Sequence, residues 1–239
     1  MGAAAAAFSL VELLVVIGII GLLLAILLPA IAEVRRTARQ AVSLSNLRAL
    51  GVGFAEYTEL FSGAYPFMSA GQAVAFGCGG TISTSDYWHV SWYWPGLLYG
   101  IIPPSESGGV YLSPTATRPF GSCGWPSSYL YSLSFVARPE LWMSGAVADE
   151  GLLAATYVHE VRQPSRKVLL WDAELPYLGR ERRYRGEDVA DASPMAFADG
   201  HAEVRAPADA TDPMLNPFFP ESPPHRLHDT AEGVYGRDY

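Results

Sequence analysis

Residues 8–32 read FSLVELLVVIGIIGLLLAILLPAIA, and this stretch determines how the rest of the chain is organised. No charged residue occurs between positions 13 and 32, so the polar face that a soluble core helix shows once per turn is missing. At a rise of about 1.5 Å per residue, the stretch extends roughly 37 Å as a helix, enough to cross a hydrocarbon layer about 30 Å thick. The composition therefore predicts a helix that inserts into a membrane.

One carboxylate interrupts the start of this apolar run. An acidic side chain in the bilayer costs about 2.5–3.5 kcal/mol, so Glu12 needs either water at the headgroup boundary or a cationic partner. No Lys or Arg of the same helix lies within reach. The partner that remains is an α-amino group, created by cleavage before Phe8 on this chain or on a neighbour. Hydration and pairing are therefore both open interpretations of Glu12.

Small residues and a proline also interrupt the run. Gly21 and Ala25 are four residues apart and share a helix face, and Gly18 lies one turn earlier. Small side chains of this kind let a second helix approach closely. Pro29 removes one backbone hydrogen bond, so we expect the helix to kink or break there.

Two kinds of processing fit this segment. In a secretory signal peptide, residues 13–28 would form the apolar region, and Ala30-Ile31-Ala32 has the small-x-small form of a cleavage site. Glu12 and the lack of basic residues before the run speak against this interpretation. In the other, cleavage occurs ahead of Phe8 and the apolar helix stays in the mature protein.

Residues 8–17, FSLVELLVVI, closely resemble the prepilin-type cleavage and methylation motif of type IV pilins and type II secretion pseudopilins. Those proteins have a small residue, then Phe, and a glutamate four residues on, which here are Ala7, Phe8 and Glu12. Pro29 falls where the family often has a helix-disrupting proline. The resemblance implies that a prepilin peptidase cuts between Ala7 and Phe8 and methylates the new Phe8 amine. It also implies that Glu12 pairs with that amine on a neighbouring subunit.

The same resemblance implies a structural function. The protein would be a subunit of a type IV pilus-like filament or of a type II secretion pseudopilus, a helical polymer of identical subunits. It would be stored as a single-pass inner-membrane protein with an extracytoplasmic head, and assembly machinery of that membrane would move it into a periplasmic or extracellular filament. The residues implied in assembly are Phe8, Glu12, Gly18, Gly21, Ala25 and Pro29.

Two features depart from the family pattern. Ala7 stands where glycine is usual, and the leader at positions 1–7, MGAAAAA, contains no Lys or Arg. Basic residues instead follow the helix, at Arg35, Arg36 and Arg39. By the positive-inside rule alone, this distribution would place the C-terminal part of the chain in the cytoplasm. The charge pattern and the resemblance thus imply opposite orientations.

After the apolar run the sequence becomes amphipathic. Apolar residues recur at three- and four-residue steps, at Val34, Ala38, Ala41, Leu44, Leu47, Leu50, Phe54, Tyr57 and Phe61. This spacing predicts one helix over about 8–60, in which the part at 33–62 continues into the head. Gly51 and Gly53 weaken that helix, and Gly63 ends it.

The head is predicted from residues 63–206, which are rich in Gly, Ser, Pro and aromatic residues. KVLLW at 167–171 predicts a buried strand. MAFADGHAEVR at 195–205 predicts a β-hairpin, because Asp-Gly between alternating residues suits a two-residue type I′ turn. The predicted fold class is α+β, a long N-terminal helix packed on a mainly antiparallel sheet. Residues 207–239 are acidic and contain six prolines, which predicts a flexible tail.

Further segments resemble one branch of the family, the large-headed, single-helix pseudopilin-like proteins abundant in planctomycetes. These are NLRALG at 46–51, followed by Tyr57 and by AYP at 64–66, and FADGH at 197–201. The branch signature places a histidine ten residues before the Asp, where this chain has Val189. Only the hairpin is therefore carried over from the branch.

Three groups of side chains in the head have more than one interpretation. The aromatic group Trp88, Trp92, Tyr93, Trp94 and Tyr99 suits a carbohydrate or partner surface, or else core and subunit contacts, which we favour. Cys78 and Cys123 would be able to form a disulfide in an oxidising compartment. The acidic residues Glu187, Asp188, Asp191 and Asp199 offer oxygen ligands of the type that calcium takes, although such loops are usually only solvated. His225, His228 and Asp229 offer ligands for zinc, although they lie in the proline-rich tail.

Charge and motifs exclude several functions. The net charge is −8, and it comes entirely from residues 61–239, because residues 1–60 carry four basic and four acidic side chains. This acidity argues against nucleic acid as a partner. No nucleophile elbow, P-loop, zinc-protease or dinucleotide motif occurs, so we expect neither an enzyme nor a required cofactor. The alternative to a filament subunit is a membrane-tethered or secreted extracytoplasmic domain that binds a glycan or a protein.

Overall fold

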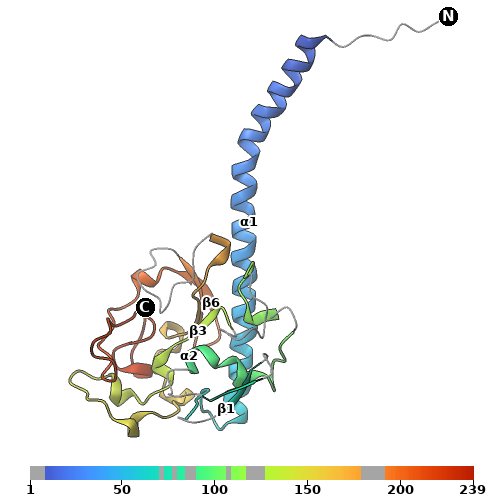
Figure 1. The fold of residues 1–239 in the computed structure, drawn as a ribbon. Helices are drawn as coiled ribbons and strands as arrows, with labels where there is room; N and C mark the ends of the chain where they lie inside the picture. Colours follow the sequence, from blue (N-terminus) through green and yellow to red (C-terminus); the bar gives the residue numbers. More distant parts are fainter. Residues whose placement is uncertain are drawn as a thin grey trace, which may run out of the picture. The chain divides into compact units, whose positions relative to one another are not determined.

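The computed structural model describes residues 9–69, 73–76, 80–83, 90–105, 109–116, 127–178 and 192–239. The chain divides into two compact units, Met1–Arg39 and Gln40–Tyr239. Helix α1, Leu10–Leu60, contributes to both units (Figure 1). The structure confirms the predicted α+β class, in which a long N-terminal helix joins a head built on an antiparallel sheet.

Helix α1 continues through its proline and ends where the glycine signal predicts. Pro29 lies inside the helix without breaking it. After Leu60 the backbone turns to positive φ at Ser62 and at Gly63, whose φ is 87°. The Gly63 N–H donates to the carbonyl of Thr58 at 2.7 Å, which satisfies a carbonyl at the helix end.

Four antiparallel strands form the main sheet in the order β3-β4-β5-β6. Their bounds are Tyr129–Tyr131, Val168–Asp172, Ser193–Phe197 and Ala202–Arg205. The predicted strand at 167–171 is therefore confirmed as β4, which is buried along its whole length. Strands β3, β4 and β5 bury successive residues on both faces of the sheet, which means that both faces are covered.

Helix α1 covers one face of the sheet. Leu47, Leu50 and Phe54 pack with Tyr131 of β3 and with other large side chains in the main apolar core. The predicted stripe is longer than the buried face, because Val34 and Phe61 are exposed while the buried helix residues lie between Ser43 and Thr58. Both core glycines of the helix are buried, and a Cβ at Gly53 would lie 2.3 Å from Cδ1 of Ile102. A larger residue at position 53 would thus require the Ile102 side chain to move.

The C-terminal segment, residues 207–239, covers the other face, which corrects the prediction of a flexible tail. Leu227 and Ala210 pack with Trp171 of β4 and with Met195 and Phe197 of β5 in a second core. This sheet face is strongly apolar, and removing it from water is what favours packing of the segment against it. The prediction rested on proline content, which carries no information about the second apolar face of the sheet.

The hairpin of β5 and β6 forms with a different turn from the one predicted. The Gly200 N–H donates to the carbonyl of Phe197, and the Phe197 N–H donates to that of His201, both at 2.9 Å. The pair Phe197 and His201 therefore encloses a loop of three residues, in which Gly200 adopts a φ of 88°. A type I′ turn needs positive φ at two residues, and Asp199 is not among the residues with positive φ. The side chain of Asp199 instead accepts from the His201 N–H at 3.1 Å.

Short elements complete the described head. A separate pair of antiparallel strands comprises β1, Ala73–Phe76, and β2, Gly80–Ser83. Two short helices follow, α2, Val90–Tyr93, and α3, Pro95–Leu98. Single 3₁₀ turns are η2 Gly109–Tyr111, η3 Leu133–Phe135, η4 Pro139–Trp142, η5 Glu150–Leu152, η6 Val158–Glu160, η7 Pro164–Arg166, η8 Pro176–Leu178, η10 Pro207–Asp209 and η11 Gly233–Tyr235.

Candidate functional site

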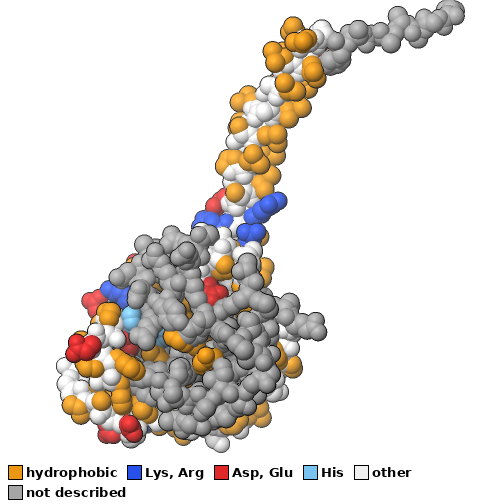
Figure 2. Space-filling model, viewed as in Figure 1, with side chains coloured by type: hydrophobic (Ala, Val, Ile, Leu, Met, Phe, Trp, Pro, Cys, Tyr) orange, Lys and Arg blue, Asp and Glu red, His pale blue; other side chains and the backbone are white. Residues whose placement is uncertain are grey.

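The apolar N-terminal part of α1 exposes its large side chains. Exposure ranges from 81% at Leu10 to 38% at Ile31, and none of the most apolar window of the helix is buried. Figure 2 shows these side chains along the helix until a group of basic side chains is reached. A helix of this length and composition is able to cross a membrane, and its exposure distinguishes it from the core helix of a soluble protein. So large an apolar surface requires lipid or protein to cover it.

A reciprocal pair of hydrogen bonds fixes the first turn of this helix. The Ser9 N–H donates to Oε2 of Glu12 at 2.9 Å, and the Glu12 N–H donates to Oγ of Ser9 at 3.2 Å. This arrangement is a capping box, which satisfies two backbone donors that have no partner within the helix. The Ser-x-x-Glu spacing in the sequence is the signal for such a cap, and it gives Glu12 a partner within its own chain besides the ion pair expected above. Phe8 and Ala7 lie outside the described residues.

The small residues leave an open face on the helix. A Cβ at Gly18 or Gly21 would meet no atom within 4 Å, so nothing in the described chain occupies the space beside them. Gly21 and Ala25 lie one turn apart on that helix. The backbone is thus accessible to a second helix at these positions, as close helix packing requires.

The described aromatic residues of the head contribute mainly to its core. Trp94 is completely buried, and its Nε1–H donates to the carbonyl of Tyr129 at 3.1 Å. Tyr93 and Tyr99 are half-buried and pack against the same core, while the half-buried Trp92 packs against the second core. Trp88 lies outside the described residues. The structure therefore supports the core interpretation for the described members of this group.

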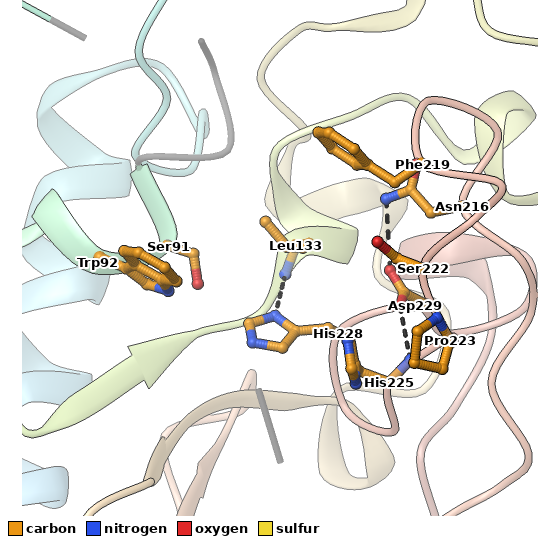
Figure 3. Close-up of a pocket in the computed structure, with 10 residues that line it drawn as sticks. All are labelled: Ser91, Trp92, Leu133, Asn216, Phe219, Ser222, Pro223, His225, His228 and Asp229. Carbon is orange, nitrogen blue, oxygen red and sulfur yellow. Dashed lines mark hydrogen bonds between the residues drawn. The ribbon is translucent and has the colours of Figure 1, made fainter. Parts of the chain in front are cut away.

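The histidines of the C-terminal segment line a small cavity of about 40 Å³, whose walls combine polar and apolar side chains. Figure 3 shows His225, His228 and Asp229 beside Trp92 and Phe219. The Asp229 carboxylate accepts from the His225 N–H at 2.7 Å, and Nδ1 of His228 accepts from the Leu133 N–H at 3.3 Å. These hydrogen bonds of Asp229 and His228 thus stabilise the folded conformation of the segment. The cavity has room for about one water molecule.

Of the other candidate ligand residues, Asp199 is the one that lies within the described ranges. Asp199 lies in the hairpin turn, where Oδ1 is 2.5 Å from Nδ1 of His201. Within the described ranges, no group of three or more His, Cys, Asp or Glu side chains is placed to hold a metal ion. The remaining candidates, Cys78, Cys123, Glu187, Asp188 and Asp191, lie outside those ranges, as does Val189.

A buried carboxylate connects α1 to the sheet, and no local sequence pattern marks it as a functional residue. Oδ2 of Asp172, at the end of β4, accepts from Ser43 Oγ of the helix at 2.8 Å and from Ser113 Oγ at 2.6 Å. Oδ1 accepts from the N–H groups of Glu174 and Leu175. Burial raises the pKa of Asp172 to about 6, although these hydrogen bonds lower it in part.

A buried ion pair connects the C-terminal segment to the same strand. Lys167, the single lysine of the chain, is fully buried. Its Nζ donates to Thr230 Oγ1 at 2.6 Å and lies 3.4 Å from the carboxylate of Asp238. That carboxylate also accepts from the Val168 N–H at 2.8 Å. Burial lowers the pKa of Lys167, and the neighbouring Asp238 opposes this shift.

Comparison with known proteins gave no match, whether to a protein-family model, to a curated protein or to a solved structure.

Proposed function

We propose that this protein is a structural subunit of a type IV pilus-like filament or a type II secretion pseudopilus. The observation that carries the proposal is the exposed apolar half of α1, which begins within a prepilin-like sequence and has no cover within the described chain. Before assembly the bilayer covers this surface, and afterwards the helices of identical subunits do. The function of the protein is then structural, because it consists of polymerisation through helix packing.

Processing is the first step of the proposed pathway. A prepilin peptidase removes residues 1–7 and methylates the amine of Phe8. Intact mass and terminal sequencing of protein from its native membrane or filament fraction test this step. We expect a start at methylated Phe8. A start at Glu33 would identify a secreted protein, and an intact Met1 would identify a tethered domain.

Glu12 has two separable roles in this proposal. Its carboxylate caps the first turn within the chain, and its charge pairs with the Phe8 amine of a neighbouring subunit. Gln at this position keeps the capping geometry but has no charge. We expect Glu12→Gln to remain in the membrane fraction and to form no filaments, whereas Ser9→Ala, which removes half of the cap, still assembles. Normal filaments from Glu12→Gln would contradict the pairing role.

The alternative, a tethered or secreted binding domain, has less support. Its proposed surface was the aromatic group, and Trp94 of that group is fully buried. The cavity beside Trp92, at about 40 Å³, is too small for a sugar ring. Filament assembly is therefore the function that the described residues favour.

A further inference from the structure

Three arginines follow the apolar segment of α1 within the N-terminal unit, and their environments differ. Arg36 is paired, because its Nε and Nη2 donate to the carboxylate of Glu33 at 2.9 and 2.6 Å. Arg35 and Arg39 have no carboxylate partner among the residues that the structure describes. They are four residues apart, so both lie on one face of the helix about one turn from each other. Two unpaired guanidinium groups thus share a face beside the apolar surface.

The length of the apolar run fixes the depth of these arginines in a bilayer. The 20 residues at 13–32 lack any charge and extend about 30 Å as a helix, which matches the hydrocarbon thickness. Glu12 and Glu33 then mark the two boundaries. Arg35 lies about 4.5 Å beyond residue 32 along the axis, and Arg39 about 10 Å. The headgroup layer is roughly 5–8 Å deep, and a long side chain is able to bend back toward it.

We propose that Arg35 and Arg39 form a binding site for the phosphate groups of anionic lipids in the leaflet where the apolar segment ends. A planar guanidinium matches phosphate in charge and hydrogen-bond geometry. Each basic residue near an anionic membrane surface strengthens association by about fivefold. The site holds the helix at a defined depth, because its two groups lie just outside the hydrocarbon. The inference rests on the membrane-inserted state in the proposed function, and not on filament assembly.

The test uses the full chain in a neutral detergent with phosphatidylglycerol and phosphatidylcholine of equal acyl length. Native mass spectrometry measures the relative affinity of the two lipids. We expect the chain to prefer phosphatidylglycerol by at least about fivefold, and 0.5 M salt to reduce this preference. Arg35→Gln/Arg39→Gln should bring the ratio close to one. The matched control, Glu33→Gln/Arg36→Gln, removes one ion pair without changing the net charge and should keep the wild-type ratio.

The outcomes separate this inference from the proposed function. Equal affinity for both lipids in the wild type, or an unchanged preference in Arg35→Gln/Arg39→Gln, would overturn the lipid site. An equal loss of lipid preference in the control variant, which keeps Arg35 and Arg39, would also overturn it. That result would show that the preference does not depend on these two arginines in particular. Self-association that depends on Arg35 and Arg39 without lipid preference would assign them to a second copy instead. Failure of the chain to float with vesicles would overturn membrane insertion itself.

Discussion

Asp172 shows how a single side chain joins distant segments of the head. It stands at the end of β4, and hydroxyl groups of Ser43 and Ser113 donate to its carboxylate from two other segments. Complete burial, with no cation beside it among the described residues, makes the charged form costly, which is why the pKa rises despite four hydrogen bonds. The same residue therefore positions the helix on the sheet and makes stability depend on pH.

The sign of that dependence follows from the pKa in the two states. The pKa of Asp172 is about 6 in the folded chain, against an ordinary value of 3.8, so the folded state binds the proton more tightly. Stability from this group is complete below about pH 4 and is lost as the pH rises through 6, by roughly 3 kcal/mol. Urea unfolding of the full chain in detergent should show this fall, and Asp172→Asn should remove it. Exposed Glu56→Gln serves as the control and should keep the wild-type slope.

At the scale of elements, the C-terminal segment is held to β4 by a buried charge pair. Asp238 accepts from Thr230 Oγ1 at 2.6 Å as well as contacting Lys167, so three side chains form one network in an apolar surrounding. Such a network stabilises the fold only while both charges remain, since each alone would be buried without compensation. The adjacent second core supplies the apolar part of the same interface.

Removing one charge should therefore cost more than removing both. We expect Lys167→Met to lower the free energy of unfolding by about 3–5 kcal/mol, because Asp238 is then buried without a cation. Lys167→Met/Asp238→Asn should recover part of that loss. Equilibrium unfolding in urea measures both, with the exposed Arg166→Gln as a control close to wild type. A double variant less stable than the single one would contradict this account of the pair.

At the scale of the whole molecule, the chain contains two large apolar surfaces, one buried and the other exposed. The sheet of the head is covered on both faces by its own chain, through α1 and the segment at 207–239. The apolar half of α1 remains uncovered within the described residues (Figure 2). The apolar surface of the sheet is thus buried by the chain itself, whereas that of the helix requires lipid or protein to cover it.

Amide hydrogen exchange of the full chain tests whether the C-terminal segment belongs to the head. The N–H of Met214 donates to Asp229 at 2.8 Å, and that of Asp238 donates to Arg166 at 2.9 Å. We expect these amides to exchange at rates close to those of β4, and those around Val147, which is 75% exposed, to exchange rapidly. Exchange across 207–239 as fast as at Val147 would restore the prediction of a flexible tail.

Local pattern was sufficient for several features of this protein. A charge-free run of 20 residues specifies an exposed apolar helix, since length and composition suffice for that. The glycine at position 63 marks the helix end, and KVLLW marks a buried strand, because both signals act over a few residues. Asp199-Gly200 marked the hairpin but not its turn type, which depends on which of the two residues adopts positive φ.

Contacts between residues far apart in the sequence became visible only in the folded chain. The bonds from Ser43 to Asp172 and from Lys167 to Thr230 join residues 129 and 63 positions apart, and no local pattern encodes such pairs. The role of residues 207–239 was hidden for the same reason: whether a proline-rich segment packs depends on an apolar sheet face contributed by other parts of the chain. The position of a segment long and apolar enough to cross a membrane could be predicted from the sequence, because hydrophobicity is a property of the segment. The tertiary structure decided how the head closes, because burial depends on neighbours that only the folded chain brings together.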